Sequence, residues 1–224
     1  LSQILDLVKP LDIELVELDQ AGDMILASKI YANLDQPPFK SSAMDGYAIN
    51  ANDLQPGAEL KIIGQSVAGL GFDGKVSNGT AVRIFTGAPV PKGSDHILIQ
   101  EDCIKSNDKI IINKVFDKND FIRPKGGDFK VGDCIDAPLK LNASLISLLA
   151  AMNIANVPVF RKPIIALIAT GDELVNVGEV PEKDQIISSN NYGLKTLIET
   201  SGGIARLLPI ARDTSQELKT VLNL

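Results

Sequence analysis

The spacing of apolar residues divides the chain into regions that predict different secondary structure. In the first region, apolar positions at helical spacing predict a short helix over residues 2–9 and a second helix over residues 22–33. Residues 13–18 alternate between apolar and acidic side chains and predict a short strand between the two helices. Pro37 and Pro38 then make an extended, stiff connector, and we expect a domain boundary there.

From residue 47 to about residue 123 the pattern becomes that of a β domain. Short β-branched runs alternate with turns that are rich in Gly, Asn and Pro. The runs cover residues 60–63, 81–85, 96–99 and 109–112. Strands at this spacing are typical of a small barrel or sandwich, so we predict a small β-barrel-like domain.

After this β region, the apolar residues again show helical spacing. Asn142 is a good N-cap for a strong amphipathic helix, and residues 157–160 read as a short strand after it. Since these elements resemble the first region, we infer that the β domain is inserted into a first, mixed helix/strand domain. The predicted division is residues 1–34 with 132–160 as that first domain, 35–131 as the inserted β domain, and 161–224 as a third part.

The third part reads as β-α-β-α. Residues 164–169 are a continuous apolar strand of the kind that is buried in a parallel sheet, and a helix follows over residues 190–200. A second strand over residues 205–210 precedes a helix that opens with the capping-box pair Thr214 and Glu217. This is the start of a doubly wound sheet. Because two strands do not complete such a sheet, and because the chain has no initiator Met, we expect a fragment of a longer protein.

Composition narrows the class of protein. The formal net charge is −6 and Lys and Arg form no cluster, which makes nucleic acid an unfavourable partner. No apolar run reaches membrane-spanning length, so we expect neither a membrane span nor a membrane partner. Cys103 and Cys134 are isolated and read as buried or half-buried thiols of a reducing, cytoplasmic protein. His96, the only histidine, lies in a strand-like run, which disfavours a Ser-His-Asp triad.

Acidic or glycine-rich turns carry the candidate chemistry. Asp45 and Gly46 form a turn that we expect to need a positive φ. Such a turn holds the short aspartate side chain close to the main chain, so that its carboxylate has a defined position. A hairpin turn with a solvated aspartate is the alternative. Similar turns recur at residues 86–89, 126–128 and 170–173.

The turn at residues 170–173 follows a predicted parallel strand, and Asp213 follows the next strand. Open α/β sheets bind ligands beyond the carboxyl ends of their strands, so Glu173 and Asp213 are expected on one rim. Mg²⁺ takes one or two protein carboxylates together with water and phosphate, so these two acids are candidate Mg²⁺ ligands. The alternative is that Asp172 and Asp213 only cap helices. The chain contains neither a P-loop nor a Gly-x-Gly-x-x-Gly run.

Taken together, the motifs resemble those of the molybdopterin molybdenumtransferase (MoeA) family, whose eukaryotic relative is the gephyrin E domain. The resemblance rests on Pro38 and Phe39, on Ser-Ala-Met-Asp-Gly-Tyr-Ala at residues 42–48, and on Arg-Ile-Phe-Thr-Gly-Ala-Pro-Val-Pro at residues 83–91. Gln100 and Glu101, the Thr-Gly-Asp-Glu turn at residues 170–173 and the helix at Asn190 continue it in order.

The resemblance implies a fold, a reaction and a site. It implies that the third part is a truncated, molybdopterin-binding-like α/β domain. It also implies Mg²⁺-dependent insertion of molybdenum from molybdate into adenylylated molybdopterin with release of AMP, in a homodimer whose active-site cleft lies between subunits. By motif match, the implied catalytic acids are Asp45, Asp128, Glu173 and Asp213. The implied substrate-binding residues are Ser42, Thr86, Arg123, Thr170 and Asn190.

The chain departs from the family pattern at three places. The family's Arg-Gly-Glu-Asp is Lys-Gly-Gly-Asp at residues 125–128, its Asp-Ser/Thr-Asn is Ser-Ser-Asn at residues 188–190, and its Asp-Asp is Asp-Thr at residues 213–214. The family's Gly-Gly-x-Ser and Lys-Pro-Gly-Lys-Pro segments and its fourth domain have no counterpart in these 224 residues, so we expect the chain alone not to turn over. A gephyrin-like binding scaffold and a paralogue that acts on another pterin or nucleotide remain the alternatives.

Overall fold

The computed structural model describes residue 3, residues 7–113 and residues 119–224. The chain divides into two compact units. The first unit comprises Leu1–Lys29, Asp136–Leu148 and Ala155–Leu224, and the second comprises Ile30–Ile135 and Leu149–Ile154. Of the helix expected over residues 2–9, residues 2 and 4–6 lie outside the described residues, and residues 7–9 are not helical. The three domain boundaries stay a prediction.

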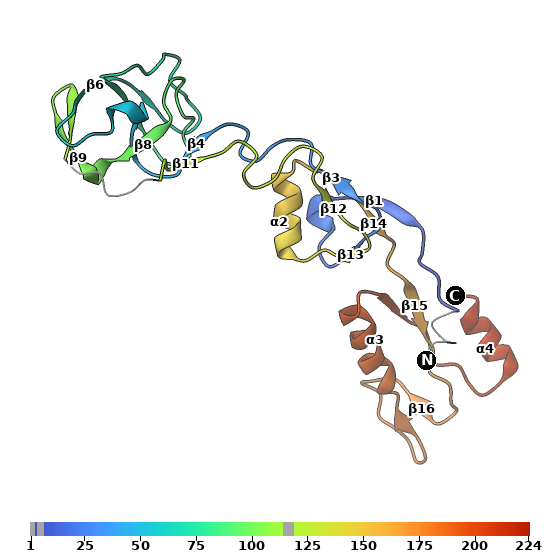
Figure 1. The fold of residues 1–224 in the computed structure, drawn as a ribbon. Coiled ribbons are helices and arrows are strands. Elements are labelled where there is room, and N and C mark those ends of the chain that lie inside the picture. The colour runs from blue at the N-terminus through green and yellow to red at the C-terminus, as the bar shows by residue number, and fades with distance from the viewer. Residues whose placement is uncertain (1–2, 4–6, 114–118) are drawn as a thin grey trace. The chain divides into compact units, whose positions relative to one another are not determined.

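A curled, six-stranded sheet is the centre of the second unit (Figure 1). Its strand order is β8-β5-β7-β6-β10-β9, and each neighbouring pair is antiparallel except β6 and β7. The strands are β5 (Gly46–Ile49), β6 (Glu59–Ser66), β7 (Thr80–Ile84), β8 (His96–Ile99), β9 (Cys103–Ser106) and β10 (Lys109–Ile112). The strands expected from the β-branched runs are therefore confirmed.

Both faces of β5 are buried. Tyr47 and Ile49 belong to one hydrophobic cluster, whereas Ala48 belongs to another, because side chains alternate between the two faces of a strand. Ile110 lies in the first cluster and Ile97 in the second, and both are fully buried. The strand that follows Asp45 is thus enclosed by apolar packing on both sides.

The helix expected over residues 22–33 is wrong, since two short strands occupy this stretch. β2 (Ile25–Leu26) pairs with β13 (Leu139–Lys140) and with β14 (Asn156–Phe160), and β3 (Ile30–Tyr31) pairs with β12 (Cys134–Ile135). Leu26 and Ile30 are buried while their neighbours Ile25 and Tyr31 are exposed, as in half-buried strands. The partner strands lie far along the sequence, and such long-range pairing overrides the local helical spacing.

In the first unit, β1 (Ile13–Glu17), β14, β2 and β13 form a four-stranded antiparallel sheet. The strand predicted over residues 13–18 is confirmed as β1, and the one predicted over residues 157–160 is β14. Helix α2 (Ala143–Ala151) begins where its cap was expected, because Asn142 Oδ1 accepts a hydrogen bond of 2.9 Å from the Leu145 N–H.

The α/β segment contains two parallel strand pairs. β15 (Ile164–Leu167) pairs with β18 (Ile204–Leu207), and β16 (Leu174–Val175) pairs with β17 (Ile186–Ile187). Helices α3 (Asn190–Thr200) and α4 (Ser215–Leu222) are confirmed, whereas the second pair was not predicted. The predicted burial of the first strand is wrong: Ile164 is 62% exposed, because β15 pairs only with β18 among the described strands.

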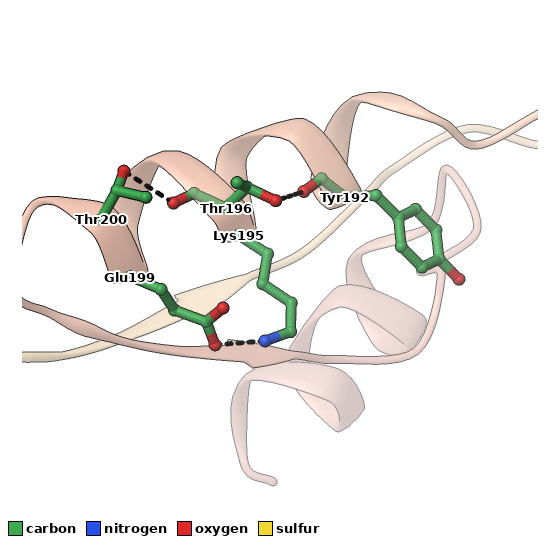
Figure 2. Close-up of polar contacts among 5 residues, drawn as sticks. All are labelled: Tyr192, Lys195, Thr196, Glu199 and Thr200. Atoms are coloured by element: carbon green, nitrogen blue, oxygen red, sulfur yellow. Dashed lines mark hydrogen bonds and ion pairs between the residues drawn. The ribbon is translucent and has the colours of Figure 1, made fainter.

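Helix α3 satisfies its own polar side chains on the face shown in Figure 2. The Thr196 hydroxyl donates to the Tyr192 carbonyl at 3.1 Å, and the Thr200 hydroxyl donates to the Thr196 carbonyl at 2.9 Å. Lys195 and Glu199 form an ion pair one turn apart. An exposed ion pair of this kind stabilises a helix by only roughly 0.2–0.5 kcal/mol, and threonine hydroxyls bonded to carbonyls one turn back do not add to that, so we read this face as a solvated surface.

The remaining expectations from composition have mixed outcomes. Cys103 is half-buried, and its thiol donates to the Gln100 carbonyl at 3.4 Å, but Cys134 is exposed, contrary to expectation, because it pairs at the edge of a two-stranded sheet. His96 is buried in β8. Within the described ranges, every helix is too short or too polar to cross a membrane.

Candidate functional site

The Asp45 carboxylate is fixed by a neighbouring turn. Its Oδ1 atom accepts two hydrogen bonds from Thr86, one from the main-chain N–H and one from the hydroxyl, both at 2.8 Å. These two bonds hold the pKa of Asp45 below its ordinary value, and the charge of Arg83 acts in the same direction. Asp45 is therefore an ionised carboxylate with one oxygen atom anchored.

Ser42 connects the two turns. Its N–H donates to the Ala88 carbonyl at 3.0 Å, and its own carbonyl accepts from the Gly87 N–H at 2.9 Å. The Ser42 side chain is fully buried, and its hydroxyl donates to the Met44 carbonyl at 2.6 Å. In this structure Ser42 builds the turn, and its expected contact with substrate stays a prediction.

Gly46 corrects the expectation of a positive φ. It lies in strand β5, outside the residues with left-handed backbone, whereas Gly87 has φ +79° and Gly126 has φ +66°. A Cβ atom at Gly46 would collide with the carbonyl oxygen of Leu98 on the neighbouring strand β8. Glycine is needed here because two main chains approach closely and not because the chain turns.

Arg123 and Asp128 form a second charged element of the same unit. The Arg123 Nη2 atom donates to both carboxylate oxygens of Asp128, at 2.7 and 2.8 Å. Strand β11 (Ile122–Arg123) pairs with β4 (Ser41–Ser42), so this ion pair belongs to the chain segment next to the Asp45 turn. Asp45, Thr86, Arg123 and Asp128 are thus brought onto connected elements.

The departure at Lys125 has a local structural role. Its Nζ atom lies 3.2 Å from Asp35 Oδ2, and Asp35 also accepts from the Val131 N–H at 2.9 Å. The Val131 hydrogen bond and then Lys125 lower the pKa of Asp35. Lys125 therefore stabilises the loop that carries Asp128.

Two residues that sequence reasoning did not assign to the site hold the main chain of the Asp45 turn. Arg83 Nη1 donates to the Gly46 carbonyl at 3.1 Å, and Arg83 Nη2 donates to Gln100 Oε1 at 2.6 Å. The Gln100 N–H in turn donates to the Asp45 carbonyl at 3.3 Å. An arginine inside the apolar run of residues 81–85 was the signal that could have identified this contact.

The loops after β15 and β18 lie side by side, as expected for neighbouring parallel strands. Thr170 pairs with Ala211, and the Gly171 N–H donates to the Ala211 carbonyl at 3.1 Å. Asp172 Oδ1 accepts from the Asp213 N–H at 3.2 Å. The Glu173 carboxylate lies over Gly171, where it would collide with any added Cβ atom.

Arg212 is the residue that sequence reasoning missed at these loops. Its Nη1 atom faces three carbonyl oxygens, those of Gly171, Asp172 and Leu174, at 3.4, 2.9 and 3.1 Å. A cation among three carbonyls fixes the path of the turn that carries Glu173. The position of Arg212 directly before Asp213 in the sequence was the signal that could have identified this contact.

The helix-cap alternative for Asp172 and Asp213 is wrong. Thr214 caps helix α4, because its Oγ1 atom accepts from the Glu217 N–H at 3.2 Å. Asp172 is followed by strand β16 and not by a helix. Asn190 is the exposed first residue of α3, as predicted.

The predicted acids thus lie in two different units. Asp45 and Asp128 belong to the second unit, and Glu173 and Asp213 belong to the first. Across the residues that the structure describes, no three or more His, Cys, Asp or Glu side chains gather as a metal-binding group. The roles of the predicted site residues stay predictions.

The fold and these turns define a strand-rich, multi-part protein that presents acidic loops. The family model for the MoeA N-terminal region (domain I and II) matches residues 1–153. The chain therefore belongs to the MoeA family, as the motifs indicated.

Relatives and solved structures agree with this assignment. The chain is 35% identical over 214 residues to a molybdopterin molybdenumtransferase of Nostoc sp., covering 92% of this chain and 49% of the relative. It is 36% identical over 192 residues to one of Haemophilus influenzae, covering 85% and 48%. A crystal structure of the molybdopterin biosynthesis MoeA protein of Pyrococcus horikoshii matches with TM-score 0.84 and 32% identity, covering 99% of this chain and 58% of that one. The chain thus spans about half the length of the curated relatives that it matches.

Proposed function

We propose that this chain is part of a cytoplasmic enzyme of molybdenum cofactor biosynthesis. The proposed reaction inserts molybdenum from molybdate into adenylylated molybdopterin and releases AMP. The observation that carries the proposal is family membership over residues 1–153, together with relatives that are named molybdopterin molybdenumtransferase. The fixed, ionised carboxylate of Asp45 supports an enzyme over a gephyrin-like scaffold, since a scaffold does not require such a group.

The proposed roles follow from the two units to which the acids belong. Asp45, oriented by Thr86, would face the reacting end of the substrate, and Arg123 would hold Asp128 in place beside it. Glu173 and Asp213 would act from the loops of the α/β segment, with Thr170 and Asn190 at the same edge. In a homodimer, Asp45 of one protomer would approach Glu173 of the partner subunit.

The donor set fits Mg²⁺. Glu173 and Asp213 are exposed carboxylates, and carboxylate oxygens are the ligands that Mg²⁺ takes together with water and phosphate. When bound, Mg²⁺ would offset the negative charge that develops as AMP leaves. The protein's own contribution is to hold the two loops together through Arg212 and the Asp172 carboxylate.

The test uses the complete gene product with molybdate, Mg²⁺ and adenylylated molybdopterin. Asp45→Asn and Glu173→Gln should each lower turnover by about 100-fold or more, in the range seen when one group that stabilises a transition state is removed. Asp53→Asn is the matched control, because this aspartate accepts from the Gly79 N–H at 2.9 Å in the same unit and has no proposed role. Wild-type turnover by both site variants would refute the assignment.

Two further arms address the alternatives. The chain of residues 1–224 alone should give no turnover, and robust molybdenum insertion by it would contradict that expectation. Product analysis with other pterins and nucleotides tests the paralogue. If these were converted in place of adenylylated molybdopterin, the reaction proposed here would be wrong while the family assignment would stand.

A further inference from the structure

Arg83 occupies an unusual position in the curled sheet. It lies directly opposite Tyr47 in the register of β5 and β7. The carbon atom of its guanidinium lies 5.0 Å from the centre of the Tyr47 ring and 4.8 Å from the centre of the Phe85 ring. Two rings at this distance hold a guanidinium by cation–π attraction and fix the direction of its donors.

The guanidinium is connected to the carbonyl groups of Asp45 and Gly46, the first two that follow the Asp45 side chain. It reaches the Gly46 carbonyl directly at 3.1 Å. It reaches the Asp45 carbonyl through Gln100, whose side-chain oxygen accepts from Arg83 at 2.6 Å and whose N–H donates to Asp45 at 3.3 Å. Arg83 and Gln100 thus hold two successive peptide groups, Asp45–Gly46 and Gly46–Tyr47, directly after the Asp45 side chain.

Thr86 completes the arrangement from the other side. Its N–H and hydroxyl fix the Asp45 carboxylate, while Arg83 and Gln100 fix the main chain from which that carboxylate projects. Among the described residues, the hydrogen bonds of Arg83 go to the Gly46 carbonyl and to Gln100 and not to the Asp45 carboxylate, so the arginine holds the aspartate through the main chain.

From this geometry we infer that Arg83 is a positioning residue for Asp45. It holds the turn so that the Asp45 carboxylate meets the reacting group in one orientation. The inference rests on the proposed function, because it gives Asp45 a part in the reaction. Its physical basis is that a displacement of about 1 Å in a reacting group can lower the rate by roughly 100-fold.

The test measures kcat and KM of the complete gene product with adenylylated molybdopterin and molybdate. Arg83→Gln should lower kcat by about 10- to 100-fold while KM changes by less than about threefold, because an interaction that only orients the reacting group acts on the chemical step. The kcat of Arg83→Lys should lie between that of the wild type and that of Arg83→Gln. The charge is kept, but an ammonium group cannot donate to Gly46 and Gln100 in the fixed geometry of a guanidinium fork. Lys105→Gln is the matched control, because Lys105 is a nearby cation that lines the same hollow of the sheet as Arg83.

A double-mutant cycle separates positioning from simple support of the fold. In an Asp45→Asn background, Arg83→Gln should cost less than about twofold in kcat, since the group it positions is gone. An equal loss in both backgrounds would show that Arg83 only stabilises the sheet, and it would overturn the inference. If Arg83→Gln fails to fold, the same cycle with Arg83→Lys and Asp45→Asn decides the question.

The outcomes also separate this inference from the proposed function. If Asp45→Asn itself turns over like the wild type, the proposed function fails and the inference fails with it. If Asp45→Asn is impaired while both Arg83 variants match the Lys105→Gln control, only the positioning role of Arg83 is refuted.

Discussion

Two acidic turns of this chain are built on very different supports. The Asp45 turn leads into β5, whose four residues are all buried within a six-stranded sheet. The turn that carries Glu173 follows β15, which pairs in a two-stranded sheet and leaves Ile164 62% exposed. The first turn is supported by a closed core, and the second is supported mainly by hydrogen bonds.

The difference shows how each carboxylate is oriented. Asp45 is held by the side chain and N–H of Thr86 and by a clamped main chain, all within one unit. The turn at Glu173 is held by Arg212, an exposed side chain that faces three carbonyl oxygens, and by main-chain hydrogen bonds such as that from the Ile186 N–H to the Glu173 carbonyl at 2.9 Å. Within these 224 residues, the Asp45 carboxylate is thus held by direct hydrogen bonds on a buried sheet, whereas the Glu173 turn is held by contacts at an exposed edge.

The largest expected effect contrasts the two supports directly. Ile110→Ala should lower the free energy of unfolding of the 224-residue chain by about 2–5 kcal/mol, because it empties a fully buried site in the curled sheet. Ile164→Ala should change it by no more than about 0.5 kcal/mol, as for an exposed position. Urea denaturation followed by circular dichroism, with hydrogen exchange to localise the change, measures both. Equal losses would mean that the two sheets are supported alike.

A smaller effect is expected at Arg212. Arg212→Gln should destabilise the α/β segment by about 1 kcal/mol. This is less than is usual for hydrogen bonds to a charged group, because the Arg212 side chain is exposed to water. Hydrogen exchange should rise in residues 170–174 and 211–214 and stay unchanged in β5. Lys195→Gln on α3, which removes an exposed cation without touching these loops, is the control. Unchanged exchange at residues 170–174 would argue against the role given to Arg212.

The smallest effect concerns the titration of Asp45. Thr86→Val removes the hydroxyl but keeps the N–H, so the pKa of Asp45 should rise toward its ordinary value while staying below it. A lowered pKa in the folded state stabilises the protein above the pKa of the unfolded state, and this stabilisation disappears as the pH falls through the folded-state pKa. The variant should therefore be less stable than the wild type at neutral pH, and the two should converge in acid.

Carbon-13 NMR of the Asp45 carboxyl group measures this pKa directly. Thr80→Val is the matched control, because the Thr80 hydroxyl donates to the Ser77 carbonyl and not to an acid. An Asp45 pKa that is the same in Thr86→Val and in the wild type would show that the hydroxyl does not stabilise the carboxylate.

Local pattern was sufficient for elements whose stabilising contacts are close in sequence. The Asn142 cap and the Thr214 cap both use neighbouring residues, and both were predicted. The helix over residues 22–33 was wrong, because β2 and β3 pair with strands that are distant in sequence. Apolar spacing in a short window does not distinguish a helix from strands whose partners lie outside that window.

The candidate site divides in the same way. The acidic turns and the adjacency of the loops that carry Glu173 and Asp213 followed from motif and strand order, whereas the residues that hold these loops did not. Arg83, Gln100 and Arg212 act on main-chain carbonyls that are contributed by other elements. Such contacts have no sequence spacing, because they depend on where distant chains meet.

The sequence by itself determined the β-rich middle region, the α/β order of the last 60 or so residues and the positions of the acidic turns, because propensity, turn chemistry and capping act over a few residues. Only the tertiary structure decided why Gly46 must be glycine, since the reason is the Leu98 carbonyl on a neighbouring strand. It also decided that Ser42 is buried within its turn and that Arg83 holds the Asp45 main chain. These features depend on close approach between segments that are far apart in sequence, and such approach is settled only when the sheet forms.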